Sequence, residues 1–327
     1  MPASVALEPL SPHAQSPRHE KYDRLIAAAQ ALPTLRVAVA HPCDEAALGA
    51  ALEAAELGLI EPILVGPAAK IAAAAAAARL DISALRQVGA AHSHEAAAKA
   101  VELVRCGEAD ALMKGSLHTD ELMSAVVARD IGLRTARRIS HCFLMDVPGH
   151  PDALIITDAA INIAPSLEDK RHIVQNAIDL AHALKFEEAR VAVLSAMETV
   201  NPDVPSTIEA AALCKMADRG QITGGIVDGP LALDNAIDLG SAAIKHITSP
   251  VAGRANILVV PDLEAGNMLA KSLTFLAGAD AAGIVLGARV PIILTSRADS
   301  KSTRLASCAV AALLAAAQRA VAKAVEV

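Results

Sequence analysis

Residues 259–299, VVPDLEAGNMLAKSLTFLAGADAAGIVLGARVPIILTSRAD, contain the alternation of strand and helix that decides the fold. Apolar runs predict three buried strands, at 257–260, 283–286 and 291–294. Leu269, Leu273 and Leu276 lie at helical spacing between the first two runs, which predicts a connecting helix. The stretch therefore predicts an α/β fold, in which ligands bind beyond the carboxyl ends of the strands.

Two strand ends of this stretch deliver polar residues. Gly266 and Asn267 stand at the predicted helix start, where a close glycine and free backbone N–H groups suit an anion. Ser296, Arg297 and Asp299 follow the last strand, and a guanidinium suits planar recognition of phosphate or carboxylate. Asp299 either takes a proton or orients Arg297. The pattern predicts an enzyme site for an anion with acid–base chemistry.

The rest of the chain continues the same alternation. Apolar runs at 36–40, 62–65 and 109–113 are separated by helical segments, which predicts a mostly parallel sheet with helices on both faces. Two later runs around a Pro-Gly turn predict a hairpin and a crossing into a second domain. We expect residues 1–20 to be a mobile tail, 21–141 plus 286–327 to form domain I, and 142–285 to form domain II, with the site in the cleft between the domains.

A second polar strand end follows the run at 109–113. Gly115 allows a close approach of the backbone to a ligand. Lys114, Ser116 and Thr119 are suitable donors to a phosphate or a carbonyl, and His118 is the histidine that we place near the site. The alternative is an ordinary turn in which Thr119 caps the next helix.

The third polar strand end holds Asp158 and Asn162, which follow the predicted strand 153–156. A carboxylate directly after a buried strand is costly unless it is paired. This predicts either a substrate-binding or base role for Asp158, or a carboxylate that caps a turn. Four arginines between 129 and 138 form either a solvated surface or a site for a polyanionic nucleotide.

Composition and charge narrow the class of protein. At 327 residues the chain exceeds the usual size of one core. The net charge of −7 argues against nucleic acid and anionic membranes as partners. Five scattered cysteines without a C-x-x-C pattern are typical of reduced thiols, and the first twenty residues have no apolar signal-peptide core. We therefore expect a cytoplasmic protein.

Several motifs resemble the phosphate acetyltransferase/phosphate butyryltransferase family: MKGSLHT at 113–119, ITDAAIN at 156–162, VDGPLALDNA at 227–236, PDLEAGN at 261–267 and PIILTSRAD at 291–299. The resemblance extends from about residue 37 to the C-terminus. VDGPLALDNA and TSRAD are more similar to the butyryltransferase branch. The resemblance implies two α/β domains of the isocitrate dehydrogenase-like type and usually a homodimer.

The same resemblance implies a reaction. Acyl-CoA and phosphate are converted reversibly into acyl phosphate and CoA, with a short acyl group from acetyl to butyryl, by thiolate attack within a ternary complex. No metal and no cofactor is implied, since CoA and phosphate are substrates. Ser296 matches the residue that hydrogen-bonds the acyl group, and Arg297 matches the one that binds phosphate. The acetyltransferase base, seven positions after the serine, is replaced here by Thr303, so Asp299 is the substitute candidate.

Two other functions remain open from the sequence. A dehydrogenase of the same general fold would need metal-binding histidines at strand ends, which the motifs do not supply. A non-catalytic acyl-CoA sensor with a degraded site would bind CoA without releasing a thiol, and the threonine at position 303 is compatible with it.

Overall fold

The structure is a computed structural model that describes residues 20–296 and 299–325. The first half contains the elements α1 (Glu20–Gln30), β1 (Leu35–Ala40), α2 (Glu45–Glu56), β2 (Ile60–Gly66), α3 (Ala68–Ala78), β3 (Gln87–Gly89), α4 (Ser93–Arg105), β4 (Ala111–Lys114), α5 (Thr119–Val126), β5 (Ser140–Asp146), β6 (Leu154–Thr157) and α6 (Leu167–Ala183). The second half contains β7 (Arg190–Leu194), α7 (Pro205–Asp218), β8 (Ile226–Leu231), α8 (Leu233–Ile237), α9 (Leu239–Ile244), β9 (Ile257–Val259), α10 (Leu263–Ala277), β10 (Asp280–Leu286), β11 (Ile292–Ile293) and α11 (Lys301–Val325).

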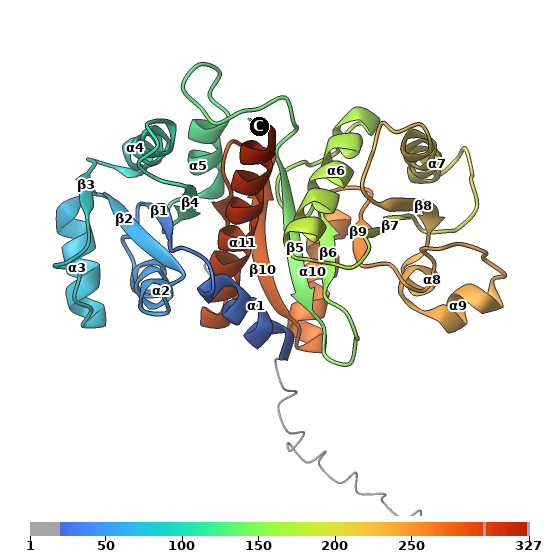
Figure 1. Cartoon of the computed structure of the whole chain (residues 1–327), viewed down its shortest axis with the longest axis horizontal. Coiled ribbons are helices and arrows are strands. Elements are labelled where there is room, and N and C mark those ends of the chain that lie inside the picture. Colours follow the sequence, from blue (N-terminus) through green and yellow to red (C-terminus); the bar gives the residue numbers. More distant parts are fainter. Residues whose placement is uncertain (1–19, 297–298, 326–327) are drawn as a thin grey trace, which may run out of the picture.

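The described strands form one 11-stranded sheet in the order β3-β2-β1-β4-β11-β10-β5-β6-β9-β7-β8. The pairs β10–β11, β10–β5 and β5–β6 are antiparallel, and the flanking strands are parallel. Figure 1 shows the strands running through the molecule with helices on either side, and α11 (dark red) across its middle. The expected α/β fold with mostly parallel strands is confirmed.

Alanine and branched aliphatic side chains build the core between these layers. The strand β1 buries five of its six residues, as expected for a central strand covered on both faces. The helix α11 packs against β10, α1 and α2. By length and apolar composition α11 would also pass as a membrane span, but 56% of the relevant window is buried inside the fold, and buried core helices share that composition.

Two strand predictions needed correction. The sequence pattern predicts a strand at 223–227 that ends at Asp228, Gly229 and Pro230, but β8 lies at Ile226–Leu231 and includes these three residues. Because β8 is an edge strand, the missing N–H of Pro230 need not break a ladder on both sides. The strand β3 was missed because its three residues are short, polar and largely exposed.

The expected domain boundaries fall inside two paired strands. Position 141/142 lies in β5 and position 285/286 lies in β10, and these strands pair with each other in the middle of the sheet. The strands assigned to both domains thus belong to one continuous sheet. The division into two domains stays a prediction.

Candidate active site

A cavity of about 790 Å³ lies between α10, the strands β5 and β10, and the turns that follow β4 and β11. Six of the predicted site residues line it: Lys114, His118, Thr119, Asn267, Ser296 and Asp299. They come from three segments that are far apart in the sequence. The fold therefore gathers the polar ends of β4 and β11 and the first turn of α10 around one space.

The turn after β11 is held by hydrogen bonds between its own residues. The backbone N–H of Ser296 donates to Asp299 Oδ2 at 2.6 Å, and Arg304 Nη2 donates to the Ser296 carbonyl oxygen at 3.0 Å. Burial raises the pKa of the Asp299 carboxyl, although the Ser296 hydrogen bond and the charges of Arg304, Lys114 and Lys271 oppose that shift. A raised pKa brings a carboxyl closer to the range that suits a general base.

Arg297 lies outside the described residues. Its assignment as the phosphate ligand therefore remains a prediction based on the motif.

The turn after β4 brings a cation to the same space. Lys114 is 5% exposed, and its Nζ lies 3.4 Å from the carbonyl oxygen of Thr295 and 3.5 Å from that of Gly115. Its ammonium group thus joins the ends of the neighbouring strands β4 and β11. His118, and not Thr119, occupies the N-cap position of α5, and its backbone N–H donates to Glu121 Oε2 at 2.7 Å.

Gly115 and Ser116 contact the protein itself and are not among the residues that line the cavity. A Cβ on Gly115 would lie 2.4 Å from the Ala40 carbonyl oxygen, so glycine allows β4 to approach the end of β1. The Ser116 hydroxyl donates to the His41 carbonyl oxygen at 2.8 Å. Their predicted roles in substrate binding stay untested predictions.

Asp158 and Asn162 bond mainly to each other and to the turn after β6. Asp158 Oδ1 accepts from the backbone N–H groups of Ala160 and Ile161, each at 3.0 Å. Asn162 Nδ2 donates to Asp158 Oδ2 at 2.6 Å. This geometry matches the turn-capping alternative, and neither residue is among those lining the cavity.

Gly266 acts at the contact between α10 and the turn after β6. A Cβ at this position would lie 2.9 Å from the Asp158 carbonyl oxygen and 2.8 Å from Val260 Cγ2. Glycine therefore lets the start of α10 lie against that turn, where Asn267 Nδ2 donates to the Ala159 carbonyl oxygen at 3.3 Å.

Several residues that line the cavity were missed by the sequence analysis, among them His141, Phe143 and Lys271. His141 and Phe143 are two positions apart in β5, so the period of two would have placed them on one face. Lys271 follows Asn267 by four positions in α10, so helical spacing would have placed it beside Asn267. Thr303, noted as the replacement for the acetyltransferase base, also lines the cavity.

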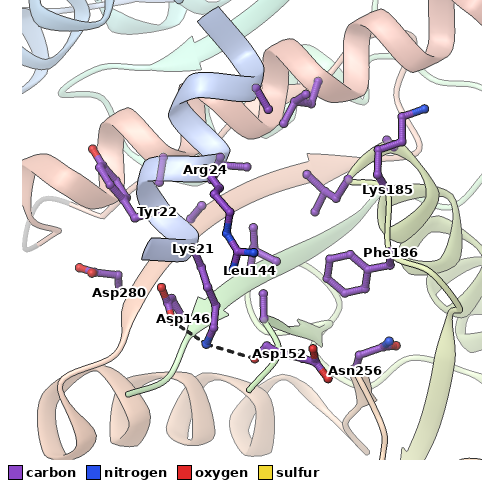
Figure 2. A pocket seen from close by; sticks show the side chains of 18 of the residues that line it. Lys21, Tyr22, Arg24, Leu144, Asp146, Asp152, Lys185, Phe186, Asn256 and Asp280 are labelled. Carbon is purple, nitrogen blue, oxygen red and sulfur yellow. Dashed lines mark hydrogen bonds and ion pairs between the residues drawn. The ribbon is translucent and has the colours of Figure 1, made fainter. Parts of the chain in front are cut away.

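A second cavity, of about 520 Å³, lies beside α1 and the end of α6. Figure 2 shows Lys21 reaching across it toward the hairpin between β5 and β6. Lys21 Nζ donates to Asp146 Oδ1 at 2.8 Å and to the His150 carbonyl oxygen at 2.7 Å. None of the predicted site residues lines this cavity, so we take the larger cavity as the candidate active site.

Comparison with known proteins supplies the family. The family model described as "Phosphate acetyl/butaryl transferase" matches residues 90–312. The chain belongs to this family. A phosphate acetyltransferase from Rhizobium meliloti is 70% identical over 92% of this chain and 95% of that protein. A phosphate butyryltransferase from Clostridium beijerinckii is 42% identical over 91% of this chain and 98% of that protein.

A solved structure agrees with the family. The branched-chain phosphotransacylase from Enterococcus faecalis V583 has a TM-score of 0.76 and 29% identity, covering 86% of this chain and 99% of that one. The family predicted from the motifs, and an enzyme of the transferase class, are thus confirmed. The expected closeness to the butyryltransferase branch is not supported, because the acetyltransferase relative is far more similar than the butyryltransferase one.

Proposed function

We propose that this protein transfers a short acyl group reversibly between CoA and inorganic phosphate, giving acyl phosphate and CoA. The observation that carries the proposal is the joining of Lys114, Ser296 and Asp299 around one cavity, in a chain of the phosphate acetyl/butaryl transferase family. A cation, a hydroxyl and a carboxyl are the groups needed to bind a phosphorylated acyl donor and to deprotonate a thiol. We assign the substrates to this cavity on that basis.

The chemistry follows from the ordinary reactivity of a thiol. A free thiol with a pKa of about 8.5 is mostly protonated at neutral pH, so a base must take its proton as it attacks. Asp299 is our candidate for that base. The thiolate then attacks the acyl carbonyl carbon within a ternary complex, and the bond to the phosphate oxygen breaks. We assign Ser296 and Lys114 as donors to the developing oxyanion.

The test is thiol release from acetyl-, propionyl- and butyryl-CoA, each with and without inorganic phosphate. Release that depends on phosphate would establish the transferase. We expect acetyl-CoA to be the best of the three, in line with the relative of 70% identity named as an acetyltransferase. CoA binding without any release would instead favour the non-catalytic sensor and would overturn the proposal.

We also propose that the enzyme is a cytoplasmic homodimer and that its reaction uses neither metal nor cofactor. Exposed apolar side chains on α10 support the dimer, because Met268 and Leu276 are 63% and 86% exposed. Large apolar side chains grouped along one helix favour contact with another protein surface. Sedimentation of the wild type and of Leu276→Glu would test it, and an unchanged mass would exclude this face as the interface.

A further inference from the structure

His141 is a buried histidine in the wall of the cavity. It lies in β5, where Phe143 is on the same face, and both residues line the cavity. The residue is only 1% exposed. The two rings meet edge to face, with centroids 4.4 Å apart and an angle of 75° between their planes. The imidazole is thus fixed by packing in the wall of the cavity.

One nitrogen of the imidazole has no hydrogen-bond partner in the part of the chain that the structure describes. Nδ1 is buried and has no hydrogen-bond partner among the described residues. Nε2 lies over Gly283, where a Cβ would approach it to 3.2 Å, so glycine leaves room for the ring. Gly283 also pairs with Leu294, the residue before Thr295 and Ser296. The ring therefore lies beside the strand end that delivers the predicted catalytic turn.

Burial keeps this imidazole uncharged at neutral pH. It lowers the pKa of His141 to about 4, although the negative charge of Asp158 opposes the shift. An uncharged imidazole has one N–H donor and one acceptor nitrogen. Because Nδ1 is fully buried and unpaired among the described residues, we assign the proton to Nε2 and leave Nδ1 as the acceptor, since an unpaired buried acceptor is tolerated better than an unpaired buried N–H.

An uncharged N–H donor suits the acyl carbonyl oxygen better than it suits the phosphate. Phosphate is charged and is better held by a cation such as Lys271, which lines the same cavity. The carbonyl oxygen of the acyl group is uncharged, and a neutral N–H can donate a hydrogen bond to it. Such a donor does not have to be stripped of bound water first, as a charged group does. Uncharged histidines with lowered pKa values polarise carbonyl groups in this way in other enzymes.

We propose that His141 is a further catalytic residue, whose Nε2–H donates a hydrogen bond to the carbonyl oxygen of the acyl group during transfer. The inference rests on the proposed function and extends it to a residue outside the motifs. As the thiolate sulfur forms its bond to the carbonyl carbon, the π electrons move to the oxygen, and the N–H stabilises that oxyanion. When the carbonyl re-forms, the carbon–oxygen bond to phosphate breaks. The imidazole keeps its proton throughout.

Two substitutions and a matched control test the role. His141→Phe keeps an aromatic ring and removes the donor, and it should lower kcat by about 10²–10³-fold, as loss of one oxyanion donor does. The KM for phosphate should change by no more than about threefold, since phosphate is held elsewhere. His141→Gln retains an amide donor and should recover part of the rate. An undiminished kcat in His141→Phe would overturn the proposal.

His172→Phe is the control for the loss of a partly buried histidine. His172 in α6 also has a buried Nδ1 without a partner among the described residues, but it does not line the cavity. We expect its kcat to stay near the wild-type value. An equal loss of kcat in both variants would assign the effect at His141 to packing alone and would also overturn the proposal.

If His141→Phe does not fold, nitrogen-15 NMR of the histidine-labelled wild type can test the proposal instead. Acetyl-CoA without phosphate presents the carbonyl but cannot react, and CoA presents the same nucleotide without a carbonyl. The Nε2 resonance of His141, assigned from the spectrum of His141→Gln, should shift with acetyl-CoA and not with CoA. Identical spectra with both ligands would reject the hydrogen bond.

These results separate the two proposals. Absence of phosphate-dependent thiol release by the wild type would reject the transferase itself. An active wild type with a fully active His141→Phe variant would leave the transferase standing and reject only the role of His141.

Discussion

The turns after β4 and β6 both carry polar residues, but β4 and β6 run in opposite directions in the sheet, and the structure uses the two turns differently. Lys114, His118 and Thr119 of the first turn line the cavity. In the second turn, Asp158 accepts hydrogen bonds from backbone N–H groups and from Asn162. The first turn therefore contributes side chains to the wall of the cavity, whereas the Asp158 carboxylate of the second is bonded within its own turn. Substitutions in and around the two turns test that distinction.

The largest effect should come from the first turn. Lys114→Met keeps the length of the side chain and removes the cation, so it should lower kcat/KM by about 10²–10³-fold, because a donor to the developing charge is lost. The midpoint of thermal unfolding should change little. Steady-state kinetics with varied phosphate and acetyl-CoA measure it.

Lys215→Met is the matched control, since Lys215 pairs with Asp218 on the exposed surface of α7. Equal rates for Lys114→Met and Lys215→Met would show that Lys114 has no role in catalysis, and the proposed difference between the two turns would be wrong.

The neighbouring turn after β11 should show the next largest effect. Asp299→Asn preserves an acceptor for the Ser296 N–H but removes the base, so turnover should fall by about 10²-fold. Because burial raises the pKa of Asp299, the wild-type rate should fall on the acid side at a higher pH than for a free aspartate. Pre-steady-state thiol assays across pH measure both. A near-wild-type rate would move the base to Asp158 or to the substrate.

The second turn should respond in stability instead of catalysis. Asp158→Ala removes the acceptor of four backbone or amide donors and should cost about 1–3 kcal/mol of unfolding free energy. The activity per folded molecule should stay within about threefold. Denaturant titration and kinetics on the same samples separate the two quantities. A stable but inactive Asp158→Ala would remove the contrast between the turns and place Asp158 in the catalytic machinery.

The smallest effect is a pH dependence of stability at the edge of the second turn. His141 is uncharged in the folded state because burial lowers its pKa from 6.5 to about 4. The unfolded chain binds the proton first, so this contribution to stability is complete above about pH 6.5 and is lost as pH falls toward 4. The midpoint of thermal unfolding should therefore drop more between pH 7.5 and 5 in wild type than in His141→Gln. Equal drops would mean that His141 is already charged when folded.

Much of the fold was predictable because its signals are local. Apolar runs ended by polar or turn residues identified most strands, and alanine- and leucine-rich segments identified the helices between them. The misplacement of β8 and the omission of β3 both concern edge strands. There, pairing on one side tolerates proline and needs no apolar run.

The candidate site was predictable only in part. Ser296, Asp299 and Lys114 were found because they stand at the end of an apolar strand or within a few residues of it, and the structure brings them to one cavity. His141 was missed because β5 was expected to be a structural hairpin strand. The alternation of its side chains shows which residues face the cavity only when the position of the cavity is known. Gly266 was read as an anion site, whereas the space for its Cβ is occupied by Val260 and the turn after β6.

The sequence by itself determined the α/β class, the family and the main polar strand ends, since apolar periodicity and contiguous motifs are properties of neighbouring residues. Only the tertiary structure decided which of those ends face the same space. The contact between Lys114 Nζ and the Thr295 carbonyl oxygen joins residues 181 positions apart. Such contacts depend on the order of the strands and on which side chains are hydrogen-bonded to the backbone. The spacing of neighbouring residues in the sequence reveals neither.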